Sequence, residues 1–269
     1  MKVKDLILRP SKVSQRDKQL LLAHLLGVKA PELYLKMEEE VPLQLLEEYE
    51  KSIKKLEEGY PLQYLIGEWD FYGRTFKVVE GVLIPRPETE LLVEKTLELL
   101  DSQKDYTGLE IGVGSGCIAI TLLLERERLF MYGTDINPRA LELTRINAEN
   151  YGVSQRLKLL QGKDFEPVKG LRFDFVVSNP PYIPEGLWET LPEGVKLEGK
   201  DALIGGKKGW EFYERFAQQV GDFLKEKGFF VLEIGHDQGQ IVRELLKDYS
   251  PKIFKDYSGQ DRVVVGWKS

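Results

Sequence analysis

The sequence predicts an α/β protein whose main sheet has seven strands and follows a smaller helical region. Three observations support this fold class. From residue 106 onwards, short apolar runs alternate with segments of helical periodicity, as expected for a parallel sheet covered on both faces. A glycine-rich loop joins the first of these runs to a helix-like segment. The last two runs are separated by only four residues, 258–261, so they are expected to form an antiparallel pair.

The first part of the chain, residues 1–67, has a helical pattern and is expected to be a small domain of its own. Ser14 and Asp17 have the spacing of a helix N-terminal cap before a leucine-rich stretch, and Gly27 suits the end of that helix. A second helix is expected from 42 to 58. Its apolar residues recur at steps of three and four and so share one face: Leu46, Tyr49, Ile53 and Leu56.

Residues 68–86 are expected to form a β-hairpin that links this helical domain to the rest of the chain. Two runs rich in aromatic and β-branched residues flank the pair Gly73-Arg74, which suits a turn. A helix is then expected from Pro87, whose fixed φ suits a first helical turn. The remaining residues, 87–269, are expected to form the sheet domain.

The sheet domain is predicted from the order of its segments. The strands are expected near 107–111, 130–134, 157–160, 173–178, 228–234, 252–257 and 262–267. The helices of this alternation are expected near 116–124, 138–150, 210–226 and 237–247. The first five strands are separated by long connections, which predicts that they run parallel.

Composition excludes several classes of protein. Of the 269 residues, 42% are hydrophobic and 30% are charged, so the chain has enough apolar residues to form a core and is not intrinsically disordered. No run of about 18 apolar residues is present, and the first residues lack the apolar stretch of a signal peptide. The single cysteine, Cys117, cannot form an internal disulfide. We therefore expect a cytoplasmic protein that does not enter membranes.

The net charge of -6 bears on possible partners. A protein that binds nucleic acid usually has a basic balance or a basic stripe along the chain. This sequence has neither, so direct binding to nucleic acid is not expected. No His, Cys or Asp cluster has the spacing of a metal site, and no metal is expected. We expect the protein to act as a monomer.

The loop 112–116, with glycines at its first, third and fifth positions, is the first candidate site. Glycine allows tight turns and lets a ligand approach the main chain closely. The loop follows a predicted strand and opens a predicted helix. Asp135 ends the next strand, 23 residues after Gly112, where an acid typically binds the ribose of a nucleoside. Together these features favour a cofactor that contains a nucleoside.

The composition of this loop bears on which cofactor binds. Dinucleotide sites usually have their third glycine one residue later than Gly116. Glu110 precedes the first glycine, and a carboxylate there suits the ammonium group of S-adenosylmethionine better than a pyrophosphate. The loop therefore favours S-adenosylmethionine over a dinucleotide, with an NAD-dependent oxidoreductase kept as an alternative.

The segment Asn179-Pro180-Pro181-Tyr182 is the second candidate site. It follows an apolar strand, at the edge where open α/β sheets bind ligands. Proline at 180 holds Asn179 extended, so the Asn179 side-chain oxygen and the Pro180 carbonyl are two acceptors on a stiff backbone. Two such acceptors can bind both hydrogens of a planar NH2 group and favour electron density on its nitrogen. Tyr182 adds an aromatic ring for stacking.

The order of these motifs closely resembles the release factor glutamine methyltransferases, the PrmC/HemK family. The segment 82–90, with the sequence Ile-Pro-Arg-Pro-Glu-Thr-Glu at its end, is the most specific part of the likeness. Segments 63–67, 110–118, 178–183, 232–235 and 261–264 match in the same order. The Asn-Pro-Pro-Tyr motif alone is also shared with DNA amino-methyltransferases. The resemblance implies a Rossmann-like methyltransferase sheet with a helical N-terminal domain that binds release factors.

The resemblance also implies an activity, namely methyl transfer from S-adenosylmethionine to the side-chain amide nitrogen of a glutamine. The family's substrate is the glutamine in the Gly-Gly-Gln motif of peptide chain release factors. The residues implied in cofactor binding are Gly112, Val113, Gly114, Ser115, Gly116, Asp135, Asp164 and Asn179. Substrate binding is implied for Asn179, Pro180, Pro181 and Tyr182, and catalysis for Asn179, Pro180 and Tyr182.

Three departures from the family pattern stand out. Lys163 occupies the position after Gly162 where the family usually has the acid near the adenine, and Asp164 follows it. We expect Asp164 to replace that acid, or else backbone groups and Phe165 to hold the adenine. Near residues 196–208 the family usually has Glu-Pro where this chain has Glu198-Gly199. Glu110 stands where Asp is more usual, and little change is expected from it.

Several other residues have two interpretations. Arg86 is either an anchor for a ligand or the partner of Glu88 or Glu90 in a salt bridge. Glu233, at the end of a buried strand, is expected to be structural.

The competing functions are a DNA adenine or cytosine amino-methyltransferase, the oxidoreductase and a protein that binds the cofactor without catalysis. The DNA enzyme would need a basic recognition region, which the net charge argues against.

Overall fold

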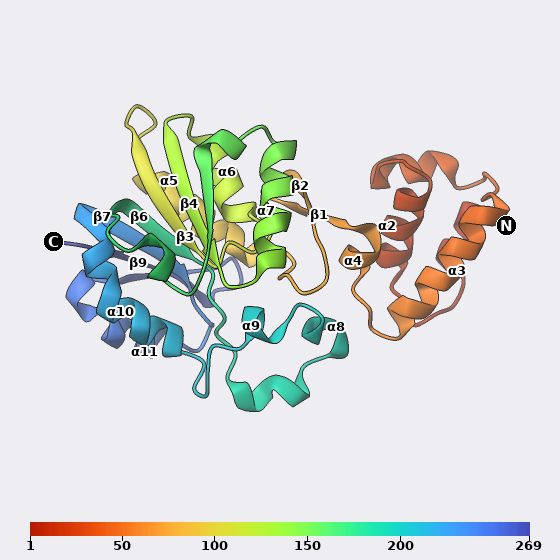
Figure 1. Ribbon diagram of the computed structural model, residues 1–269. Helices are drawn as coiled ribbons and strands as arrows, with labels where there is room; N and C mark the ends of the chain where they lie inside the picture. Colours follow the sequence, from red (N-terminus) through yellow and green to blue (C-terminus); the bar gives the residue numbers. More distant parts are fainter. The chain divides into compact units, whose positions relative to one another are not determined.

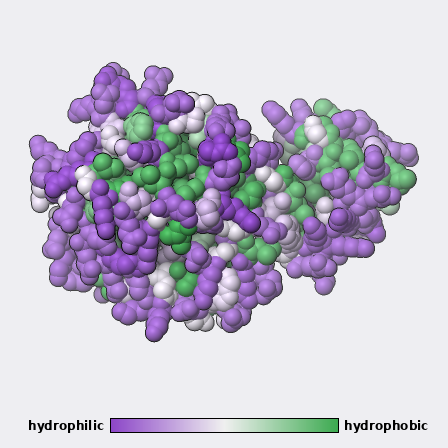
Figure 2. Space-filling model, in the orientation of Figure 1, coloured by the Kyte–Doolittle hydropathy of each residue, from purple (hydrophilic) through white to green (hydrophobic).

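The computed structural model describes residues 1–269 (Figure 1). The chain folds into two compact units. The first unit comprises Met1–Glu68 together with Pro192–Val195. The second comprises Trp69–Leu191 and Lys196–Ser269. No helix is both long and apolar enough to cross a membrane. Hydrophilic residues cover most of the face shown in Figure 2.

The first unit is helical, as predicted. Its elements are α1 (Val3–Leu8), α2 (Gln15–Leu25), the 3-10 helix η1 (Ala30–Lys36), α3 (Leu43–Glu57) and α4 (Leu62–Ile66). The Ser14 Oγ accepts a hydrogen bond from the Asp17 N–H at 3.0 Å, so the predicted cap starts α2. Gly27 has a φ of +64°, the left-handed conformation that follows the end of many helices.

The core of this unit is formed by the apolar faces of its helices. Tyr49 and Ile53 of α3 are buried against leucines of α2, as the spacing of apolar residues predicts. The Tyr49 hydroxyl donates a hydrogen bond to the Leu6 carbonyl at 3.1 Å, so its buried polar end has a partner. Burial raises the pKa of Tyr49 to about 12.

The predicted hairpin is present and is short. It consists of β1 (Glu68–Phe71) and β2 (Arg74–Lys77). The turn residues are Tyr72 and Gly73, one position earlier than the predicted pair Gly73-Arg74, because Arg74 already belongs to β2. Both have positive φ, as a tight hairpin turn requires. The rings of Phe71 and Phe76 are completely buried and belong to the hydrophobic core of the second unit.

The main sheet has seven strands, as predicted. They are β3 (Tyr106–Ile111), β4 (Leu129–Asp135), β5 (Leu157–Gln161), β6 (Phe173–Ser178), β7 (Leu224–Glu233), β8 (Lys252–Lys255) and β9 (Asp261–Trp267). Their order across the sheet is β5-β4-β3-β6-β7-β9-β8. The strands from β3 to β7 pair in parallel, and β9 is antiparallel to both β7 and β8. The short loop between the last two strands thus forces the predicted antiparallel pair.

Helices cover both faces of this sheet (Figure 1). Residues of α5 (Glu90–Leu99), α6 (Cys117–Glu125) and α7 (Pro138–Asn150) pack into one core. Residues of α10 (Glu211–Phe223) and α11 (Gly239–Leu245) pack into the other. The short elements are η2 (Pro87–Thr89), η3 (Ser154–Arg156), η4 (Glu166–Val168), η5 (Glu185–Thr190), α8 (Glu193–Lys196), α9 (Lys200–Leu203) and η6 (Lys247–Tyr249).

One boundary differs clearly from the prediction. The helix expected at 210–226 ends at Phe223, and β7 begins at Leu224 rather than near 228. Leu224 pairs with Phe173 of β6, and the register then shifts before Phe229 pairs with Phe175. Pairing with a distant strand therefore ends the helix, and the local spacing of apolar residues does not predict this boundary.

Candidate active site

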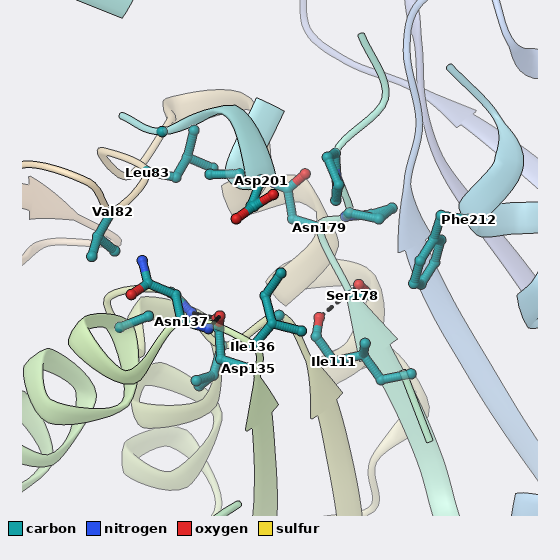
Figure 3. Close-up of a pocket in the computed structure, with 18 of the residues that line it drawn as sticks. Val82, Leu83, Ile111, Asp135, Ile136, Asn137, Ser178, Asn179, Asp201 and Phe212 are labelled. Atoms are coloured by element: carbon teal, nitrogen blue, oxygen red, sulfur yellow. Dashed lines mark hydrogen bonds between the residues drawn. The ribbon is translucent and has the colours of Figure 1, made fainter. Parts of the chain in front are cut away.

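A cavity of about 440 Å³ lies at the carboxyl ends of β3, β4 and β6 (Figure 3). The chain passes from β3 to β4 on one side of β3, whereas β6 lies on its other side. Such a change of direction leaves a crevice at the strand ends, where open α/β sheets bind their ligands. The volume is in the range of small-molecule sites.

The predicted glycine loop forms one wall of this cavity. Gly112, Val113, Gly114 and Ser115 line it, whereas Gly116 does not. Gly116 has a φ of +81°, and a Cβ there would lie 2.8 Å from both the Ile120 Cδ1 and the Thr144 Cγ2. This glycine is therefore required for packing under the loop rather than on the cavity wall.

Asp135, at the end of β4, holds the loop in place. Its Oδ2 accepts a hydrogen bond from the Gly114 N–H at 3.0 Å, and its Oδ1 accepts one from the Asn137 N–H at 2.9 Å. Burial raises the pKa of Asp135, and the backbone donors oppose that shift. Figure 3 shows Asp135, Ile136 and Asn137 on the same wall.

Glu110 is the acid that precedes the loop. It lines the cavity and is 1% exposed. Its Oε2 accepts a hydrogen bond from the Ala119 N–H in the first turn of α6 at 2.9 Å. Burial raises the pKa of Glu110 well above its usual value, and the nearby Asp135 adds to the shift. The carboxyl group thus links β3 to α6 beneath the loop.

The Asn-Pro-Pro segment forms the opposite wall. Asn179, Pro180 and Pro181 all line the cavity, directly after β6. The Ser178 hydroxyl donates to the Ile111 carbonyl at 2.7 Å, which ties the end of β6 to the end of β3 (Figure 3). The two predicted sites therefore meet in one cavity.

Tyr182 differs from its neighbours in the motif. It is not part of the cavity wall, and its ring packs against the core beneath α10 and α11. Burial, together with the nearby charge of Glu233, raises the pKa of Tyr182 to about 12. Its main-chain carbonyl accepts a hydrogen bond from the Gln238 Nε2 at 3.0 Å.

The segment after Gly162 also reaches the cavity. Both Lys163 and Asp164 line it. Asp164 has a φ of +49°, and its Oδ2 pairs with the Arg215 Nε at 2.6 Å. Phe165 is 1% exposed and stacks on Phe223 with ring centroids 4.4 Å apart, so it belongs to the core rather than to the wall.

Two segments that the sequence analysis did not assign to the site also line the cavity, residues 81–86 and 199–206. Arg86 pairs with Glu198 rather than with Glu88 or Glu90. The Oε2 of Glu198 also accepts a hydrogen bond from the Ile84 N–H at 3.1 Å. Burial raises the pKa of Glu198, and Arg86 opposes this shift.

Asp201, Ile136 and Phe212 are cavity residues that sequence reasoning missed. In Figure 3 the Asp201 carboxylate and the Ile136 side chain face the cavity, and Phe212 stands at its edge. In the sequence the apolar Ile136 directly follows a strand-ending acid, and this position is a signal that could have been used. The structure leaves Ile136 45% exposed. Asp201 and Phe212 carry no such signal. No group of His, Cys, Asp or Glu side chains is arranged to hold a metal ion.

Comparisons with known proteins bear on this arrangement. Residues 7–67 match the family described as the PrmC N-terminal domain, and residues 87–190 match the methyltransferase small domain. A release factor glutamine methyltransferase of Aquifex aeolicus is 52% identical over 98% of this chain and 95% of its own length. The chain belongs to the release factor glutamine methyltransferase family. A member from Bacillus subtilis is 37% identical over 91% of this chain and 88% of its own length.

Solved structures confirm the methyltransferase fold. A methyltransferase of Pyrococcus furiosus has a TM-score of 0.55 at 20% identity, over 84% of this chain and 98% of its own. A 16S rRNA methyltransferase of T. thermophilus has a TM-score of 0.55 at 17% identity, over 75% of this chain and 50% of its own. The predicted Rossmann-like fold is thus confirmed. The family match and the 52% identical relative show that the protein is a methyltransferase.

Proposed function

We propose that this methyltransferase transfers a methyl group from S-adenosylmethionine to the side-chain amide nitrogen of the glutamine in the Gly-Gly-Gln motif of release factors. One observation carries the proposal. The Asn179-Pro180 acceptors and the glycine loop share one cavity, in a chain 52% identical to a release factor glutamine methyltransferase. A cofactor and a planar amide can therefore be held side by side.

The residues around the glycine loop fit S-adenosylmethionine. Gly112 and Gly114 leave the main chain open to a ligand, because the space where a Cβ would stand at either glycine is nearly free of other atoms. Glu110 and Asp135 supply carboxyl groups on this wall, and Ile136 adds an apolar surface for a base. When bound, S-adenosylmethionine supplies an electrophilic methyl group. We propose that Gly112–Ser115, Asp135, Asp164 and Asn179 hold it, and that Gly116 supports the loop by close packing.

The Asn-Pro-Pro segment fits a carboxamide substrate. The nitrogen of an amide is a poor nucleophile, because its lone pair is delocalised into the carbonyl. Acceptors at the Asn179 Oδ1 and the Pro180 carbonyl would bind both amide hydrogens and favour electron density on nitrogen. The methylated nitrogen is strongly acidic, so its extra proton can pass to water without a basic side chain. We propose that Pro181 and Tyr182 support this site by packing.

The two family matches support a division of labour within the chain. We propose that residues 1–67 contact the release factor, that 68–86 link the domains, and that 87–269 bind the cofactor and catalyse transfer. We propose that the protein acts as a cytoplasmic monomer without contacting nucleic acid directly. A DNA amino-methyltransferase is the alternative, because it shares the Asn-Pro-Pro-Tyr motif.

A labelling experiment tests the proposal. The protein is incubated with tritium-labelled S-adenosylmethionine and a release factor, beside the same factor with its Gly-Gly-Gln glutamine changed to alanine and beside duplex DNA. Label on the unchanged factor alone is the expected result. Label on DNA alone, or on both factors equally, would contradict the proposal.

Asn179→Ala is expected to lower transfer by at least about 100-fold, because it removes a preorganised acceptor. Cofactor binding, measured by calorimetry, is expected to remain measurable. Asn150→Ala is the matched control, since Asn150 is exposed on α7 and should have wild-type activity. Full activity of Asn179→Ala would contradict the proposal that Asn179 accepts a hydrogen bond from the substrate amide.

A further inference from the structure

A buried chain of hydrogen bonds runs from the cavity wall into the core. The Asn179 Nδ2 donates to the Thr89 Oγ1 at 3.1 Å. The Thr89 hydroxyl in turn donates to the Glu233 Oε2 at 2.6 Å. Thr89 is 2% exposed and Glu233 is 1% exposed, so neither exchanges its partner for water readily. The three residues come from η2, β7 and the end of β6, which are far apart in the sequence.

The chemistry of the middle residue gives this chain a direction. An ionised carboxylate only accepts hydrogen bonds, so Thr89 must donate its single hydroxyl hydrogen to Glu233. The Thr89 oxygen is then left as an acceptor, and only the NH2 end of Asn179 can satisfy it. The Asn179 carbonyl oxygen therefore points away from Thr89 and is free for another donor. With the amide turned by 180°, two acceptor oxygens would face each other.

We propose that Thr89 and Glu233 are positioning residues that hold the Asn179 amide with its oxygen, and not its NH2 group, towards the substrate. This inference rests on the proposed function, in which Asn179 accepts a hydrogen bond from a substrate NH2 group. A reversed Asn179 would present donors to donors and would repel that substrate. The orientation matters because the C=O and NH2 groups of the asparagine side chain have nearly the same size, and packing alone discriminates poorly between them.

The surroundings of Glu233 determine when this direction holds. Thr89 and Tyr182 donate hydroxyl hydrogen bonds to its carboxylate, Arg262 of β9 attracts it, and Glu88 of η2 repels it. Buried Cys117 and Tyr213 also lie close enough to interact with its charge. Burial raises the pKa of Glu233 to about 7. Below that pH a protonated Glu233 can donate to Thr89, and the direction of the chain is no longer imposed.

Kinetics with paired variants test the proposal. Thr89→Val keeps the shape of the side chain but removes the hydroxyl, whereas Thr89→Ser keeps the hydroxyl. We expect Thr89→Val to lower kcat about tenfold or more, and Thr89→Ser to recover most of it, with the affinity for S-adenosylmethionine within about twofold in both. Thr96→Val is the matched control, because Thr96 is also buried but bonds only the Leu92 carbonyl of its own helix.

The pH profile separates positioning from simple packing. In the wild type, kcat at saturating cofactor should fall as the pH drops through about 7, because Glu233 becomes protonated. Glu233→Gln carries no charge at any pH, so its kcat should be lower and this acidic limb should be absent. A Glu233→Gln enzyme that keeps the acidic limb, or a Thr89→Val enzyme with wild-type kcat, would overturn the proposal.

A measurement without substrate separates this inference from the proposed function. The chain has four asparagines, at 137, 147, 150 and 179, so labelling asparagine with 15N gives four side-chain NH2 signals. The Asn179 hydrogens should exchange slowly in the wild type and faster in Thr89→Val. Asn147, which donates to the carbonyls of Lys77 and Ser115, should stay protected in both, and exposed Asn150 should exchange fast in both.

The outcomes are distinct. Unchanged exchange at Asn179 in Thr89→Val overturns the orientation mechanism even if release factors are methylated. Faster exchange at Asn179, in a wild-type protein that methylates no release factor, supports the hydrogen-bond chain and contradicts the proposed function instead.

Discussion

Asp135 and Glu233 are two acids that end strands of the same sheet, the first half-buried and the second fully buried, and they are held in different ways. Asp135 is bound by main-chain N–H groups of Gly114 and Asn137, both close to it in the loops at the strand ends. Glu233 is bound by side chains, with the Thr89 hydroxyl at 2.6 Å and Arg262 nearby. The first acid shapes a backbone loop, and the second orients a side chain. Substitutions that remove the two charges should therefore have different effects.

The largest expected effect concerns Asp135. Asp135→Ala removes two charge-assisted hydrogen bonds from the loop and a carboxylate from the cavity, so affinity for S-adenosylmethionine should fall by at least about 100-fold. Calorimetric titration measures it. Asp105→Ala, at an exposed aspartate paired with Arg128, is the control and should bind as the wild type does. Glu233→Gln should also keep its affinity. Equal losses at Asp135 and Glu233 would erase the distinction between the two acids.

The second expected effect is on stability against pH. The pKa of Glu233 is raised from 4.5 to about 7, so the folded state holds its proton more tightly than the unfolded state does. The free energy of unfolding should therefore decrease as the pH rises from about 4.5 to 7, by about 3 kcal/mol for this group. Burial raises the pKa of Asp135 as well, which acts in the same direction.

Urea unfolding of the wild type and of Glu233→Gln at pH 5 and pH 8 measures this effect. The variant lacks the titrating group, so the difference in unfolding free energy should shift in its favour at the higher pH. A difference that is the same at both pH values would mean that Glu233 is not the group responsible.

The third expected effect concerns the backbone of the loop that Asp135 holds. Gly116→Ala should destabilise the protein by roughly 2 kcal/mol more than Gly152→Ala. Both glycines have positive φ, but an added Cβ at 116 meets Ile120 and Thr144 at 2.8 Å, whereas at 152 it meets open space. Urea unfolding midpoints of the two variants measure the difference. Equal destabilisation would show that the loop relaxes around the new methyl group.

Much of the site could be predicted from the sequence because it is local. The glycine loop, Asp135 and Asn179 each follow directly after an apolar strand, and parallel strands bring their carboxyl ends together. Tyr182 shows the limit of this reasoning. It lies three residues after Asn179, but its ring packs into the core rather than lining the cavity. Adjacency in the sequence does not determine which way a side chain points once a strand has ended.

The amino-acid sequence by itself determined the fold class, the seven strands and the main segments around the cavity, since periodicity, glycines and prolines act over a few residues. Tertiary structure alone decided the contacts between distant segments. The Arg86 pair with Glu198 and the bonds from Asn179 through Thr89 to Glu233 join residues about 90 to 144 positions apart. Hydrogen bonds of this kind depend on where elements meet after packing, and no local pattern encodes that meeting.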